Sequence, residues 1–158
     1  DPQLGFSIHQ PQGWAGSFDE DGFTMGQFDP LSEGIVSPRV EVIVHGVTDG
    51  HTPKSICEAA IEAKAAEGFT MTVISHNETQ LAGVDGYEFV VRKEHPGDDT
   101  VAGHSWIEMA RVIAVDKEGE QQNMIALVVR SCDADVEKTK VIMESIAPTL
   151  KLTPGSAD

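Results

Sequence analysis

The sequence predicts an α+β fold with a mainly antiparallel sheet of about six or seven strands and two main helices on its faces. Three observations support this. Segments with the period-two alternation of strands outnumber those with helical spacing, and most follow one another through short turns. Only two segments have helical periodicity, which is too few crossover helices for a parallel sheet. The length of 158 residues suits one domain, expected at 1–152 and followed by a flexible tail at 153–158.

Three strands are predicted before the first helix. The first is the alternating run FSIHQP, which Pro11 ends because proline has no N–H to donate to a neighbouring strand, and Trp14 then covers one end of the core. The second strand is expected at 22–30 and the third at 37–47. One face of the third strand is apolar and the other is mixed, as shown by Val40, Val42 and Val44 against Glu41, Ile43 and His45.

The first helix is marked at both of its ends. Thr52 is expected at the N-cap and Pro53 at the first helical position, while Gly68 supplies the C-terminal stop. Between them an apolar, alanine-rich stripe recurs at helical spacing: Ile56, Cys57, Ala60 and Ile61.

Four further strands and a second helix complete the chain. Strands are expected at 69–83 and 84–95, joined by a tight turn at Val84, Asp85 and Gly86, and then in a long hairpin at 104–132. That hairpin is apolar on both faces, so we expect it in the middle of a sheet that is covered on both sides. The last helix is expected to be capped by Asp133 or Ser131, and its buried face to comprise Val136, Thr139, Met143 and Ile146.

Charge and hydropathy limit the class of protein. With 26 acidic and 11 basic residues the formal charge is −15, which disfavours nucleic acid and anionic lipid as partners. It favours solubility, and it leaves a basic protein or divalent cations as alternatives. No apolar run reaches the roughly 18 residues of a membrane span. The start at Asp1 is compatible with a mature protein whose targeting segment was removed, or with a trimmed chain.

Few residues are candidates for chemistry. The loop HPGDDTVAGH brings together nitrogen and oxygen donors and is a weak candidate for a divalent cation, through His95, Asp98, Asp99 and His104. No catalytic or cofactor-binding pattern is present: HExxH, G-x-S-x-G and the glycine-rich nucleotide loops are all missing. We therefore predict a non-enzymatic protein without a cofactor.

Two cysteines and one arginine each have more than one structural explanation. Cys57 and Cys132 form either one disulfide or two free thiols, and each lies near a helix start, where the helix dipole could lower a thiol pKa. Arg111 lies on an otherwise apolar strand face, so it either has a carboxylate partner, reaches the surface or faces a ligand cleft.

The opening stretch FSIHQPQGW resembles the F-x-I-x-x-P-x-x-W start of the PsbP-like superfamily. That group includes photosystem II PsbP, Ran-binding nuclear-import factors, and DcrB- and LpqN-like bacterial lipoproteins. LAGVDGYEFVVR and SIAPTLKL are similar to further segments of these proteins. The resemblance implies an α/β/α sandwich that binds another protein and has no active site shared by its members.

These observations favour a non-enzymatic protein-binding or assembly-assisting domain. We expect it to be exported, periplasmic or tethered to a membrane as a lipoprotein. One alternative is a cytoplasmic chaperone or adaptor for a secreted effector, and another is a protein that binds a divalent cation or a small ligand.

Overall fold

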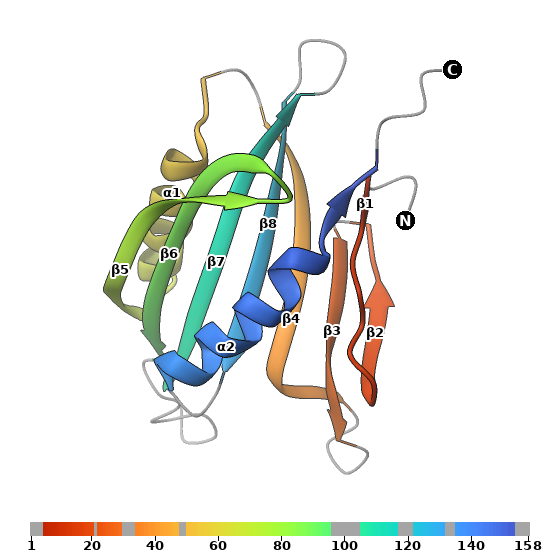
Figure 1. Cartoon of the computed structure of the whole chain (residues 1–158). Coiled ribbons are helices and arrows are strands. Elements are labelled where there is room, and N and C mark those ends of the chain that lie inside the picture. The colour runs from red at the N-terminus through yellow and green to blue at the C-terminus, as the bar shows by residue number, and fades with distance from the viewer. Residues whose placement is uncertain are drawn as a thin grey trace.

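The fold combines one large antiparallel sheet, one two-stranded sheet and two helices (Figure 1). The computed structural model describes residues 5–20, 22–29, 34–47, 50–95, 105–116, 122–131 and 135–153. The strands are β1 (Phe6–Ser7), β2 (Trp14–Phe18), β3 (Gly22–Asp29), β4 (Gly34–Val47), β5 (Thr70–Leu81), β6 (Val84–Glu94), β7 (Ser105–Asp116), β8 (Gln122–Ser131) and β9 (Lys151–Leu152). The helices are α1 (Pro53–Ala66), α2 (Val136–Ile146) and the 3₁₀ turn η1 (Ala147–Thr149).

The large sheet has seven strands in the order β2-β3-β4-β8-β7-β6-β5. All six neighbouring pairs are antiparallel, which confirms the predicted fold class. Five of these pairs join strands that are consecutive in the chain. The exception is β4 with β8, and this pairing places the β7–β8 hairpin near the middle of the sheet, as its two apolar faces predicted.

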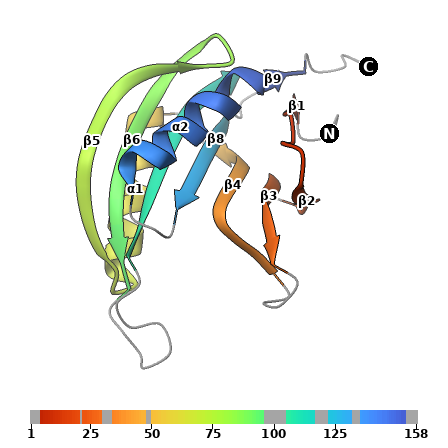
Figure 2. The same cartoon turned by 60° about the horizontal axis from the view of Figure 1, so that its bottom comes forward.

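The two faces of the sheet are covered to different extents. On one face, α2, β1 and β9 lie over the sheet, and Figure 2 shows α2 lying along the inner side of the curved strands. This layer encloses the larger apolar core, which includes Phe6, Met25, Val40, Leu127 and Met143. On the other face α1 packs on β5, β6 and β7 over a smaller core that contains Cys57, Val91 and Val112.

The first strand differs from its prediction. FSIHQP gives only the two residues of β1, and these pair with β9 in a separate two-stranded sheet, with Phe6 opposite Leu152. Ile8 lies beyond the strand, and Trp14 begins β2. The sequence prediction contained neither β2 nor β9, because WAGSF lacks apolar alternation and two residues are too short to show a period.

Two local predictions were wrong and one was right. The turn between β5 and β6 lies at Ala82 and Gly83, not at 84–86, and both residues have positive φ, as a type I′ turn requires. The N-cap of α2 is Asp135, whose side chain accepts from the amide of Lys138. The N-cap of α1 is Thr52, as predicted, and it forms a reciprocal capping box with Ser55.

Arg111 ties α2 to the sheet. Its guanidinium donates to the Glu88 carboxylate on the adjacent strand at 2.7 Å and also pairs with Glu144 of α2. Burial by itself lowers the pKa of this half-buried arginine, but the hydrogen bonds that it donates to the Glu88 and Glu144 carboxylates, and their charges, raise that pKa above its usual value. The prediction of a carboxylate partner is confirmed, so this residue has a structural role at the α2 layer.

Candidate functional site

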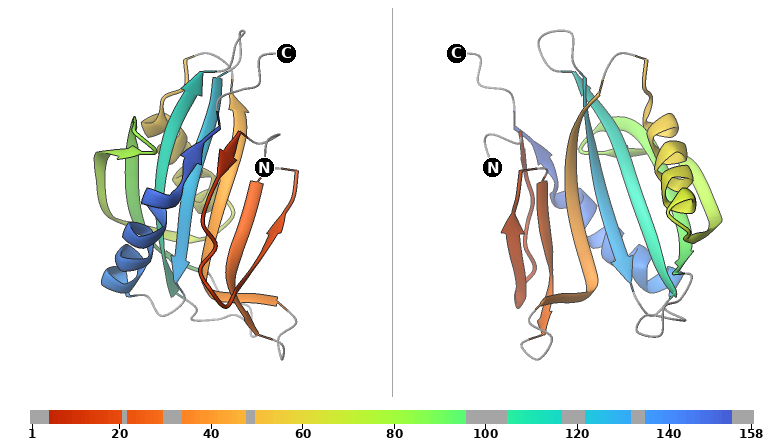
Figure 3. Two further views of the ribbon diagram at one scale, coloured as in Figure 1. Left: turned by 45° about the vertical axis from the view of Figure 1, so that its right-hand side comes forward. Right: turned by 180° about the vertical axis from the view of Figure 1, so that it is seen from behind.

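The α1 side of the sheet is only partly covered by a helix. Seen from behind in Figure 3, α1 lies over β6 and β7, whereas β4 and β8 have no helix in front of them. Ile43 and Ala126, which face one another across β4 and β8, are half-buried as a result. Such an apolar strip beside a helix is a surface on which another molecule could pack.

A groove of about 350 Å³ follows this strip between α1 and the sheet. Its floor is mostly apolar and includes Ile43, Ala110, Val112, Ala126 and Val128. Its wall is the flank of α1 formed by Ile56, Ala60, Ala63 and Glu67, which recur at helical spacing. Ala60 and Ala63 are exposed, so this flank offers small apolar side chains to solvent.

A charge ladder, defined here as Arg39, Glu41, Arg130, Glu108 and Lys93, begins at one end of the groove. Arg130, Glu108 and Lys93 line the groove itself, and Arg39 and Glu41 line the hollow that adjoins it. Successive members pair across β4, β8, β7 and β6: Arg39 pairs with Glu41, Arg130 lies 2.5 Å from Glu41 and 2.8 Å from Glu108, and Lys93 lies 3.5 Å from Glu108. The members alternate in sign, so each carboxylate contacts two cations.

The acids of the ladder are buried and two of its cations are not. The Glu41 and Glu108 side chains are 9% and 12% exposed, whereas those of Arg39 and Arg130 are 44% and 30% exposed. Lys64 of α1, 41% exposed, also lines this end of the groove, but it pairs with Glu67, 52% exposed, at 2.6 Å. The exposed charges of the ladder are therefore two arginines at the end of an apolar groove, in a protein whose net charge is strongly negative.

Lys93 is the buried end of the ladder. Its ammonium lies 5.1 Å from the centroid of the Phe69 ring and 5.5 Å from that of Trp106, distances at which cation–π attraction operates. Burial lowers the pKa of Lys93 below its ordinary 10.5; nearby Arg130 and Lys64 act in the same direction, and Glu108 opposes them. The protonated form is thus less favoured in the folded state than in the unfolded chain.

This shift predicts a pH-dependent contribution to stability. Between the lowered pKa of Lys93 and 10.5 the unfolded chain binds more protons than the folded one, so this contribution rises with pH and is complete above 10.5. Urea unfolding of the wild type and of Lys93→Met over this range would measure it. We expect the unfolding free energy of the wild type to rise relative to that of Lys93→Met as pH rises. A difference that stays constant with pH would contradict the lowered pKa of Lys93.

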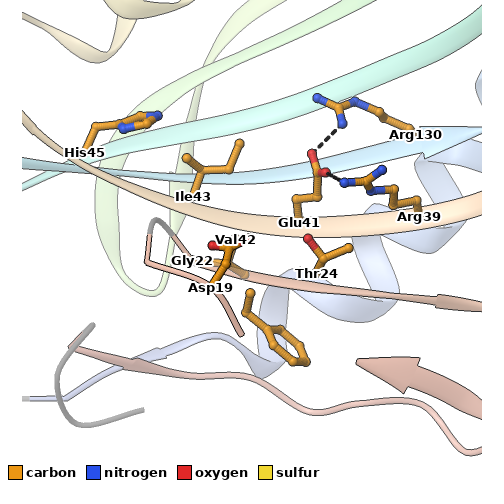
Figure 4. Close-up of a pocket in the computed structure, with 10 residues that line it drawn as sticks. Asp19, Gly22, Thr24, Arg39, Glu41, Val42, Ile43, His45 and Arg130 are labelled. Atoms are coloured by element: carbon orange, nitrogen blue, oxygen red, sulfur yellow. Dashed lines mark ion pairs between the residues drawn. The ribbon is translucent and has the colours of Figure 1, made fainter. Parts of the chain in front are cut away.

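A second hollow, of about 340 Å³, adjoins the groove and lies between β4 and β3 (Figure 4). It shares Ile43, His45 and Arg130 with the groove, and Figure 4 shows Glu41 between the two arginines. Gly22 of β3 lies beside it, where a Cβ atom would overlap the carbonyl of Val42. Glycine is therefore required for β3 to approach β4 this closely.

The predicted cation ligands are only partly described. His95 lies at the end of β6, edge-to-face with Phe69, and its Nδ1 is buried without a hydrogen-bond partner among the described residues. Asp98, Asp99 and His104 lie outside the described residues. No group of three His, Cys, Asp or Glu side chains within the described ranges could hold a metal ion, and the cation site at His95 to His104 stays a prediction.

Cys57 is a buried free thiol on the α1 face that packs on the sheet. Burial, with a smaller contribution from Glu58, raises the pKa of this thiol to about 12. The alternative of a thiol pKa lowered by the helix dipole does not hold for Cys57, because desolvation outweighs the dipole one turn into α1. Cys132 lies outside the described residues.

No local sequence pattern marks the ladder as a site. A charge within an apolar strand needs a partner or a cleft, and this holds for Arg130 in MIALVVRS as it does for Arg111. Arg130 is therefore the ladder member that the sequence indicates. The partners of Arg130 come from β4 and β7, and their proximity depends on strand order and register.

The sheet and its two helices define the class of protein as an α/β/α sandwich. Neither helix in the described part of the chain combines the length and apolarity of a membrane span. No protein-family model matches the chain, and no curated protein is similar to it in sequence. The solved structures, in contrast, contain chains that are similar over nearly its whole length.

Two of these structures identify the fold. PsbP of Synechocystis sp. PCC 6803 is 14% identical, with a TM-score of 0.64 over 96% of this chain and 89% of that one. LpqN of Mycobacterium tuberculosis, described as involved in cell envelope biogenesis, is 13% identical, with a TM-score of 0.65 over 94% and 83%. The chain has the PsbP-like fold, as the opening motif predicted. At these identities the similarity concerns the fold alone.

Proposed function

We propose that this protein is a non-enzymatic domain that binds another protein and assists its assembly. We place it outside the cytoplasm, where a lipoprotein anchor is one way in which it would be tethered to a membrane. The observation that carries the proposal is the uncovered α1-side groove with the charge ladder at its end. An apolar floor with exposed cations at its end is typical of protein–protein interfaces, which have an apolar core and a polar rim. The similarity in fold to LpqN, described by its role in cell envelope biogenesis, is compatible with an extracytoplasmic location.

Site-specific photo-crosslinking would test this function in cells that make the protein. A benzophenone amino acid at Ile43 places the probe on the groove floor, and the same amino acid at Val141, 67% exposed on α2, gives a matched control on the other side of the sheet. We expect a discrete adduct with one protein from position 43 and none from position 141. Absence of an adduct at 43, or equal adducts at both positions, would count against the proposal.

A further inference from the structure

The dimensions of the uncovered strip match those of a helix. Neighbouring strands lie about 4.8 Å apart, so β4 and β8 with one adjacent strand span roughly the 10–12 Å diameter of a helix. From Arg39 to Val47 the strand β4 rises about 26 Å, which corresponds to a helix of about 18 residues. The strip thus has the width and length of one helix lying beside α1.

The wall of the groove is suited to close helix packing. Ala60 and Ala63 face the groove and remain exposed, although α1 could carry long polar residues there at no cost to the core. On the other flank of the same helix, Lys54, Glu58 and Glu62 are exposed and charged, as is usual for a solvated face. Small residues let two helix backbones approach closely, so the alanine flank fits a helical neighbour better than open solvent.

The charge ladder specifies one end of that neighbour. Its exposed groups are the guanidinium groups of Arg39 and Arg130, while its carboxylates are buried. A helix C-terminus carries partial negative charge, and acidic side chains there would add to it. Charge complementarity therefore places the C-terminal end of the neighbour, with an acidic residue, at the ladder.

We propose that the groove receives an amphipathic helix of the partner protein, packed beside α1 on β4 and β8. Its stripe of small and aliphatic residues contacts Ala60, Ala63 and Ile43, and an acidic residue near its C-terminus pairs with Arg39 and Arg130. This inference rests on the proposed function, since it names the partner segment that the same face receives.

Synthetic peptides of about 18 residues would test this inference by fluorescence anisotropy with the full chain. The first peptide has a leucine and alanine stripe, an uncharged polar face and two glutamates at its C-terminal end. In the second the glutamates are glutamines, and the third is a scrambled form of the first without a stripe. We expect the first peptide to bind at least about tenfold more tightly than the third.

Variants of the protein separate the groove from the general surface. Ala63→Trp fills the groove, whereas Ala65→Trp makes the same change at an exposed alanine on the opposite flank of α1. We expect Ala63→Trp to weaken binding of the first peptide about tenfold and Ala65→Trp to leave it nearly unchanged. Arg39→Gln should remove the preference for the first peptide over the second, and Arg92→Gln, at an exposed arginine outside the groove, should retain it.

Several results would overturn the inference. They are no binding of the first peptide, equal binding of the scrambled peptide, and equal effects of the two tryptophan variants. The proposed function fails separately, through the crosslinking experiment. A crosslink from position 43 to an extended segment of a partner would retain the proposed function and overturn the helix alone.

Discussion

Replacing Phe6 with alanine is expected to lower the free energy of unfolding by about 3–5 kcal/mol. Phe6 is 1% exposed and belongs to the larger core, so truncation removes buried apolar surface and leaves a cavity. It is also one of the two residues through which β1 pairs with β9, and it lies opposite Leu152. The variant should therefore weaken the packing of both the N-terminal strand β1 and the C-terminal strand β9. Urea unfolding followed by circular dichroism would measure the loss.

Trp14→Ala is the matched comparison for Phe6. Trp14 packs against the same core but is only half-buried, so about 1–2 kcal/mol is expected from the apolar area it covers. Complete burial of this ring would have predicted about 3 kcal/mol. If Trp14→Ala destabilised the protein as much as Phe6→Ala, the assignment of Phe6 as the main contact of this segment would be wrong.

Removing Glu108 should be the most damaging single change at the charge ladder, with a loss of about 3 kcal/mol in unfolding free energy. Glu108 pairs with both Arg130 and Lys93, and the Lys93 side chain is only 6% exposed. In Glu108→Ala the Lys93 ammonium would lose its nearest carboxylate and stay buried between the rings of Phe69 and Trp106. Thermal and urea unfolding at neutral pH would show the effect.

A double variant separates the burial of a charge from the loss of packing. Glu108→Leu combined with Lys93→Met replaces the buried pair with apolar side chains of similar size, which is often neutral or stabilising. We expect the double variant to recover most of the stability lost in Glu108→Leu alone. If both were equally unstable, Glu108 would act through Arg130 and not through Lys93.

The charged residues of the ladder show how far sequence reasoning reaches at the candidate site. Arg130 in an apolar strand is recognisable as a residue that needs a partner. Glu41 and His45 were placed on the mixed face of their strand, and both line the hollows beside β4. The groove itself was not predictable, because it exists where α1 does not cover β4 and β8. The extent of coverage by a helix is a tertiary property without a local sequence signal.

The sequence by itself determined the fold class, the six longest strands, both helices and the cap of α1 at Thr52. These features depend on local alternation, helical spacing and capping chemistry, all of which are encoded within a few residues. The opening motif FSIHQPQGW also indicated the PsbP-like fold.

Only the tertiary structure decided the pairing of β1 with β9, the pairing of β4 with β8 and the raised pKa of Cys57. It also placed Arg39, Glu41, Arg130, Glu108 and Lys93 in one ladder at the end of a groove. The physical reason is the same in each case. Burial and electrostatic pairing arise between residues that are far apart in the chain, and only strand order, register and helix placement bring them into contact.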